Sequence, residues 1–108
     1  MSHLTDLFLK LPKDFGLERS EAEYRFIEEL TFSCVDDILL FLEEMTSRDF
    51  LILPVWLRNL AYRLATLQRP ADAGLLRKAA ADLECFGPTW DDIAASLRTH
   101  ADAIDKNT

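Results

Sequence analysis

The sequence contains few of the residues that build loops, cross-links or membrane spans. Only 3 glycines and 4 prolines occur among its 108 residues, which leaves little chain for loops and favours helices. The two cysteines, Cys34 and Cys85, lie far apart, which favours reduced, partly buried thiols in a cytoplasmic protein. The longest apolar run, residues 50–57, is interrupted by Pro54 and is far too short to cross a bilayer. We therefore expect no membrane segment.

Motifs that would indicate catalysis or a cofactor are also absent. The sequence has no glycine-rich phosphate loop, no Gly-x-Ser-x-Gly elbow and no His-Glu-x-x-His. The soft metal ligands His3, Cys34, Cys85 and His100 lie outside the spacings that preset a zinc site. Cys85 and His100 could meet if two C-terminal helices pack antiparallel, but the dipole at a helix C-terminus opposes thiolate formation. We expect no enzyme, no metal and no cofactor.

The apolar residues recur with the period of a helix along the whole chain. Leu4, Leu7 and Leu11 share one face of a short helix, and the pairs Ser20–Glu23 and Ser33–Asp36 have the spacing of helix-capping boxes. The predicted helices are residues 3–11, 20–31, 34–47, 54–69, 71–86 and 89–105. The expected fold class is therefore all-α, a compact bundle of five to six short-to-medium helices, with one domain over residues 1–108.

The stretch 54–69 has the widest apolar arc, so we expect this helix at the centre of the bundle. Its apolar half contains Trp56, Leu57, Leu60, Ala61, Leu64, Ala65 and Leu67. Pro54 suits the first helical position, where a missing N–H costs nothing. Its polar half contains Arg58, Asn59, Arg63, Thr66 and Arg69. These arginines either pair with internal carboxylates or form a docking patch.

The predicted core collects the inward positions of all the helices. It consists of Leu7, Phe8, Tyr24, Ile27, Leu30, Val35, Ile38, Leu42, Leu57, Leu60, Leu64, Leu76, Ala80, Leu83, Ile93 and Leu97.

The charge of the chain is negative and unevenly distributed. The net charge is −7, which disfavours nucleic acid and anionic lipid as partners. Residues 50–71 carry three arginines and no acid, a balance of +3, which leaves −10 for the remainder. Such a negative surface would steer a basic protein toward it. The predicted partner-binding residues are Asp36, Asp37, Glu43, Glu44, Trp56, Arg58, Arg63 and Trp90, although each tryptophan is equally well explained as core.

These features favour a non-catalytic protein-binding module. Its most concrete form is a small acidic inhibitor, similar to an immunity protein or antitoxin, that blocks a basic partner; the high apolar content is also compatible with a homodimer. The alternative is a transcriptional regulator, because residues 83–97 (LECFGPTWDDIAASL) resemble the first half of a DNA-binding helix-turn-helix. The resemblance stops there, since Leu97 continues into Arg98 without a turn residue.

Overall fold

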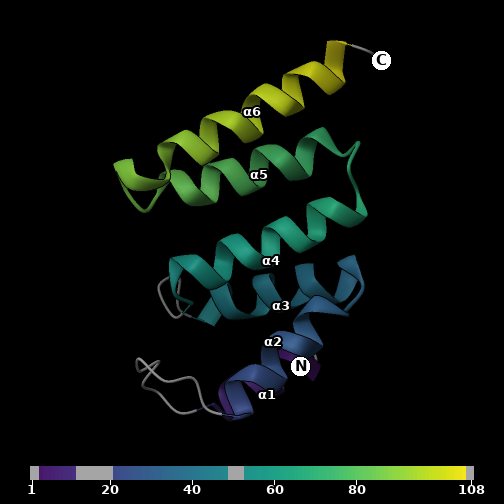
Figure 1. The fold of residues 1–108 in the computed structure, drawn as a ribbon, viewed down its shortest axis with the longest axis vertical. Coiled ribbons are helices and arrows are strands. Elements are labelled where there is room, and N and C mark those ends of the chain that lie inside the picture. The colour runs from purple at the N-terminus through teal and green to yellow at the C-terminus, as the bar shows by residue number, and fades with distance from the viewer. Residues whose placement is uncertain (1–2, 12–20, 49–52, 107–108) are drawn as a thin grey trace. The chain divides into compact units, whose positions relative to one another are not determined.

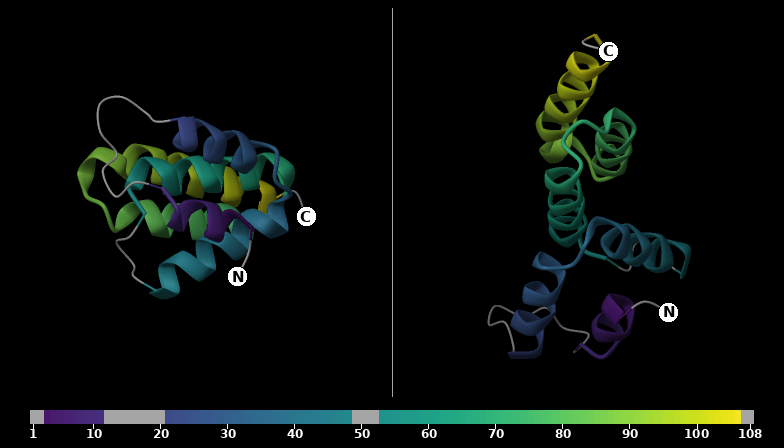
Figure 2. Two further views of the ribbon diagram at one scale, coloured as in Figure 1. Left: turned by 90° about the horizontal axis from the view of Figure 1, so that it is seen from below. Right: turned by 90° about the vertical axis from the view of Figure 1, so that its right-hand side faces the viewer.

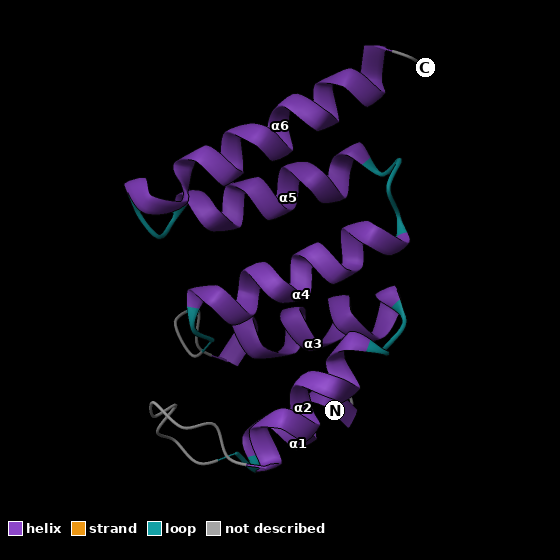
Figure 3. Cartoon of the chain, in the orientation of Figure 1, coloured by secondary structure: helices purple, strands orange, loops and turns teal. Residues whose placement is uncertain are grey.

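The chain folds into helices throughout the part that the structure describes. The computed structural model describes residues 3–11, 21–48 and 53–106. Over these ranges it has six α-helices, one short 3₁₀ helix and no strand (Figure 3). The α-helices are α1 (His3–Leu9), α2 (Glu21–Thr31), α3 (Val35–Arg48), α4 (Val55–Gln68), α5 (Ala73–Glu84) and α6 (Asp91–Lys106), and the 3₁₀ helix η1 is Pro88–Trp90. The all-α prediction is confirmed.

The chain divides into two compact units, Met1–Leu53 and Pro54–Thr108. The first unit contains α1, α2 and α3, and the second contains α4, α5, η1 and α6 (Figure 1). The organisation of the chain as one domain stays a prediction.

Most helix ends differ by one or two residues from the predicted ones, and local chemistry explains the differences. Pro54 is the N-cap of α4 with an extended ψ of 150°, so the helix begins one residue later than predicted. Asp72 caps α5 by accepting a 3.0 Å hydrogen bond from the Leu75 N–H, which moves the start of that helix from 71 to 73. Thr89 lies inside η1 and does not cap α6 directly. Ser20, the predicted cap of α2, lies outside the described residues.

Three phenylalanine rings form the centre of the first unit. Phe8 of α1, Phe26 of α2 and Phe41 of α3 are all buried, with ring centroids 5.5–5.9 Å apart. Tilted and edge-on pairs at this separation contribute about 0.5–1.5 kcal/mol each beyond their buried area. The helix α1 contacts both α2 and α3, so this cluster joins all three helices.

In the second unit, α5 lies between α4 and α6. Figures 1 and 2 show α5 and α6 side by side and antiparallel, and their contact is the most extensive between helices of the described chain. Ala80, Leu83 and Ala94 are buried between them, and the small alanines let the two backbones approach. Gly87 makes the turn after α5 with a φ of 94°, which a side chain would strain. Within this unit, α5 and not α4 has the middle position.

Most residues of the predicted core are buried or half-buried, but some helices turn a different face inward than predicted. Eight predicted residues are buried, namely Phe8, Leu30, Ile38, Leu42, Leu57, Leu76, Ala80 and Leu83. Six are half-buried, namely Leu7, Ile27, Val35, Leu60, Leu64 and Leu97. Tyr24 and Ile93 are exposed, so their assignment to the core was wrong. On α2 the buried face contains Phe26 and Leu30, and Tyr24 lies too far around the helix to share it.

The buried face of α4 is also rotated from the predicted one. Its buried residues are Leu57, Arg58, Ala61, Tyr62 and Ala65, whereas Leu67, predicted to face inward, is 76% exposed. The prediction that Arg58 lies on the polar half of the helix was therefore wrong. An ion pair between Arg58 and Asp82 of α5 explains this orientation.

Candidate functional site

The predicted acidic residues lie on the outer side of α3. Asp36, Asp37 and Glu43 are exposed and Glu44 is half-buried. At 100° per residue, Asp36 and Glu43 lie within about 20° of each other around the helix, as do Asp37 and Glu44, so the acids form two rows. Leu40 lies between the rows and is 44% exposed. We call these five residues the acidic face of α3.

The rest of α3 fixes the direction of this face. Ile38, Phe41, Leu42 and Met45 are buried on the opposite side of the helix, which leaves the acidic face turned toward solvent. The Glu44 carboxylate accepts a 3.2 Å hydrogen bond from the Thr5 hydroxyl of α1, which holds one edge of the face in place.

The whole net charge of the protein belongs to the first unit. Residues 1–53 contain twelve acidic and five basic side chains, whereas residues 54–108 contain seven of each. The first unit therefore carries −7 and the second is neutral. A charge concentrated on so small a unit produces a potential that raises the local concentration of cationic groups.

Two aromatic side chains, one on α2 and one directly after it, are exposed in the same unit. Tyr24 is 62% exposed and Phe32, directly after the end of α2, is 83% exposed. The Phe32 N–H donates to the Glu28 carbonyl at 3.2 Å, so the helical backbone extends far enough to place Tyr24, Glu28 and Phe32 on one side. We call these three residues the aromatic stripe of α2. Sequence reasoning missed it, although the i, i+4, i+8 spacing was readable.

A hollow of about 600 Å³ adjoins this stripe between α1 and α2. Leu7 and Leu11 give it apolar walls, and Tyr24 and Glu28 of the stripe also line it. The other charged residues that line the hollow are Lys10, Arg25 and Glu21. Together with Glu28 they have no net charge, so the hollow offers apolar surface rather than a charged site.

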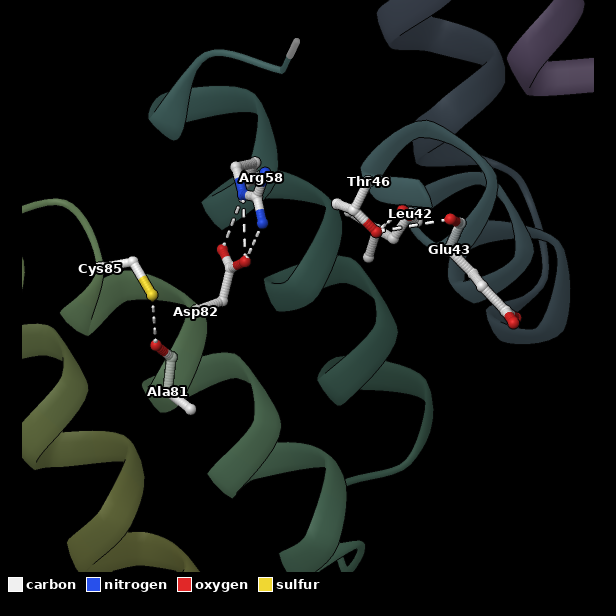
Figure 4. A network of polar contacts seen from close by, with 7 residues as sticks. All are labelled: Leu42, Glu43, Thr46, Arg58, Ala81, Asp82 and Cys85. Carbon is white, nitrogen blue, oxygen red and sulfur yellow. Dashed lines mark hydrogen bonds and ion pairs between the residues drawn. The ribbon is translucent and has the colours of Figure 1, made fainter. Parts of the chain in front are cut away.

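In the second unit, the most prominent polar feature is a buried ion pair between α4 and α5 (Figure 4). Arg58 is 1% exposed, and its Nε donates to both carboxylate oxygens of Asp82 at 3.0 Å, while its Nη2 also donates to Oδ1. The ring of Phe86 lies 5.1 Å from the guanidinium carbon and covers it by a cation–π contact. Of the two roles expected for the arginines, Arg58 has that of an internal salt-bridge partner, so it leaves the predicted partner-binding set.

Tyr62 lies near the same ion pair on α4. Burial is the main cause that raises the pKa of Tyr62 to about 12, and the negative charge of Asp82 adds to it, against a lowering by Arg58. No buried side-chain nitrogen or oxygen lacks a hydrogen-bond partner in the part of the chain that the structure describes. This cluster therefore fastens α4 to α5 and presents no reactive group to solvent.

The other predicted partner-binding residues of the second unit have different surroundings. Trp90 is half-buried against the Ala80–Leu83–Ala94 core, so much of its ring serves packing. Trp56 is half-buried and Arg63 is exposed. The eight predicted residues are thus divided equally between the two units, and the four acids are the group that the fold gathers on one face.

The structure separates Cys85 from His100, the two residues that could have formed a nucleophile and base. Cys34 and Cys85 are both free and exposed, so the prediction of partly buried thiols was wrong. The helices α5 and α6 do pack antiparallel, but Cys85 lies at the connected end while His100 lies about 13 Å further along α6. Among the described residues, no three His, Cys, Asp or Glu side chains are placed to hold a metal ion.

Exposed ion pairs join α5 to α6. Arg77 donates to Asp102 at 3.0 Å and to Asp105 at 2.5 Å, hydrogen bonds that raise the pKa of Arg77, and Arg98 pairs with Glu84. The segment that resembles a helix-turn-helix is thus one end of an antiparallel hairpin, and α6 continues unbroken from Asp91 to Lys106. A recognition helix would need a turn after Leu97, which α6 does not have.

No protein family, curated protein or solved structure matches this chain. None of the helices that the structure describes is long and apolar enough to cross a membrane. Charge and surface geometry are therefore the basis for the functional proposal.

Proposed function

We propose that the protein is a non-catalytic binding module whose first unit docks onto a basic partner protein. Its most concrete form is a small cytoplasmic inhibitor, similar to an immunity protein or antitoxin, that covers the site of a basic enzyme. The observation that carries the proposal is the acidic face of α3, where four carboxylates surround the half-exposed Leu40. This face belongs to the unit that contains the entire net charge of −7.

The arrangement suits fast association with a cationic surface. Exposed carboxylates raise the association rate at low salt by steering, and they oppose approach by acidic partners. Leu40 gives the centre of the face an apolar contact from which water can be excluded. Because the residues stand on a helix whose opposite side is buried, little order is lost on binding.

The structure offers a matched control for the charge. Asp36 and Asp37 lie in the first turn of α3, and Asp91 and Asp92 lie in the first turn of α6 in the neutral unit. D36N/D37N and D91N/D92N therefore change the net charge equally and remove the same kind of helix-end carboxylate. Asparagine is tolerated near helix starts, so both variants should fold.

The test is capture of partners from the native cell by the full chain at low and at high salt. We expect the wild-type chain to capture a basic protein at low salt. D36N/D37N should bind this protein about tenfold more weakly than wild type, and D91N/D92N should bind it almost as well as wild type. Acidic partners only, salt-insensitive capture, or equal loss in both variants would contradict the proposal. The alternative, a DNA-binding regulator, would replace it if the wild-type chain retarded genomic fragments in a low-salt gel shift.

A further inference from the structure

The aromatic stripe of α2 alternates an exposed ring, a carboxylate and a second exposed ring. From these three groups we propose that the stripe binds arginine side chains of the basic partner. This inference rests on the proposed function, because it names the chemistry by which the acidic unit recognises that partner.

The geometry of the stripe suits a row of cations. Tyr24, Glu28 and Phe32 follow one another at intervals of about one helical turn, or about 6 Å. Tyr24 and Phe32 are 62% and 83% exposed, and Glu28 is exposed between them. Single exposed apolar residues are ordinary, but here two exposed rings and a carboxylate follow one another at successive i, i+4 positions.

Arginine fits this sequence of groups better than lysine. A planar guanidinium stacks flat on an aromatic ring and can donate two parallel hydrogen bonds to a carboxylate, whereas an ammonium is a compact, strongly hydrated charge. The same combination occurs inside the second unit, where Arg58 lies over the Phe86 ring and donates to the Asp82 carboxylate. On α2 the ring and carboxylate are present and the arginine is supplied by the partner.

The hollow beside the stripe favours a partner segment that also carries an apolar side chain. Leu7 and Leu11 provide apolar walls directly beside Tyr24 and Glu28. An apolar side chain next to an arginine could enter this hollow while the guanidinium lies on the stripe. The preferred occupant is therefore a basic protein segment with arginines and neighbouring apolar residues.

A second copy of the chain is the rival occupant, since its Arg25 could lie on the stripe. Charge opposes that arrangement, because it would bring together two units that each carry −7. The charge of the first unit thus favours a cationic partner over self-association.

The test measures binding of the full chain to two labelled probes, an arginine oligopeptide and a lysine oligopeptide of equal length, by fluorescence anisotropy. Wild type should bind the arginine probe about tenfold more tightly than the lysine probe, because only a guanidinium can both stack flat on a ring and donate two parallel hydrogen bonds to the Glu28 carboxylate. Y24S/F32S should remove this preference, and Y24F/F32Y should keep it. The matched control is L67S, which removes an equally exposed apolar side chain from the neutral unit and should change nothing.

The outcomes separate this inference from the proposed function. Two results would show that the stripe does not select arginine: salt-dependent binding of both probes with equal affinity, or a preference for arginine that persists in Y24S/F32S. Neither result would contradict the proposed binding of a basic partner by the acidic unit. If neither probe binds, both proposals fail. A wild-type dimer in sedimentation that Y24S/F32S converts to a monomer would assign the stripe to self-association and overturn the inference.

Discussion

The buried ion pair between Arg58 and Asp82 allows a quantitative test of the second unit. D82L would leave the guanidinium of Arg58 buried without a carboxylate, and R58M would leave the carboxylate of Asp82 buried without a cation. Removing one partner of a buried pair costs about 3–5 kcal/mol. Because a domain is stable by only about 5–15 kcal/mol, each single variant should lose a large part of the total.

The double variant R58M/D82L gives the opposite expectation. It contains neither charge, so no desolvated group is left without a partner. Such replacements are often neutral or stabilising by about 1–4 kcal/mol. The free energy of unfolding of the double variant should therefore equal or exceed that of wild type, which makes the coupling between the two sites about 6–10 kcal/mol or more, the sum of the two single losses.

Urea unfolding followed by circular dichroism measures these free energies, provided that the slope with urea stays the same among the variants. The control is E84A, which breaks the exposed pair with Arg98 and should cost less than about 1 kcal/mol. Two results would refute the reasoning. Single variants within about 1 kcal/mol of wild type would mean that Arg58 and Asp82 are not buried against each other, and a double variant as unstable as the sum of the singles would mean that they are not coupled.

Tyr62 and the two cysteines give further expectations. The pKa of Tyr62 is about 12 in the folded protein, against an ordinary 10.0. Its contribution to the free energy of unfolding, about 3 kcal/mol, is therefore fully present below pH 10. It is lost as the pH rises to 12, because the unfolded chain loses the Tyr62 proton first. In Y24F, where Tyr62 is the one remaining tyrosine, tyrosinate absorbance should rise near pH 12; a midpoint near 10 would place the hydroxyl in water. Cys34 and Cys85 should both react with a thiol reagent in the native protein within about tenfold of the rate of free cysteine, and C34S and C85S assign the signals. A thiol that reacts only in denaturant would contradict its exposure.

The acidic face of α3 could be predicted from the sequence, whereas the aromatic stripe of α2 could not. The acids of α3 were found because their spacing and the absence of intervening bases are local properties. The exposed rings of Tyr24 and Phe32 were missed because an aromatic residue in a helical pattern is more often core, and Phe26 competes with Tyr24 for the same role on α2. Only the packing of Phe26 against Phe8 and Phe41 decides between them.

The six helices, their approximate ends and the excess of acid could be predicted from the sequence, because helical period, capping and charge depend on residues a few positions apart. The rotation of each helix about its axis could not be predicted in this way, because it depends on how the helices pack against one another. On α4 that rotation depends on Asp82, which lies 24 residues after Arg58 and offers the carboxylate that makes its burial tolerable. No local pattern contains that pairing, since the free energy that favours it arises only when α4 and α5 are packed together.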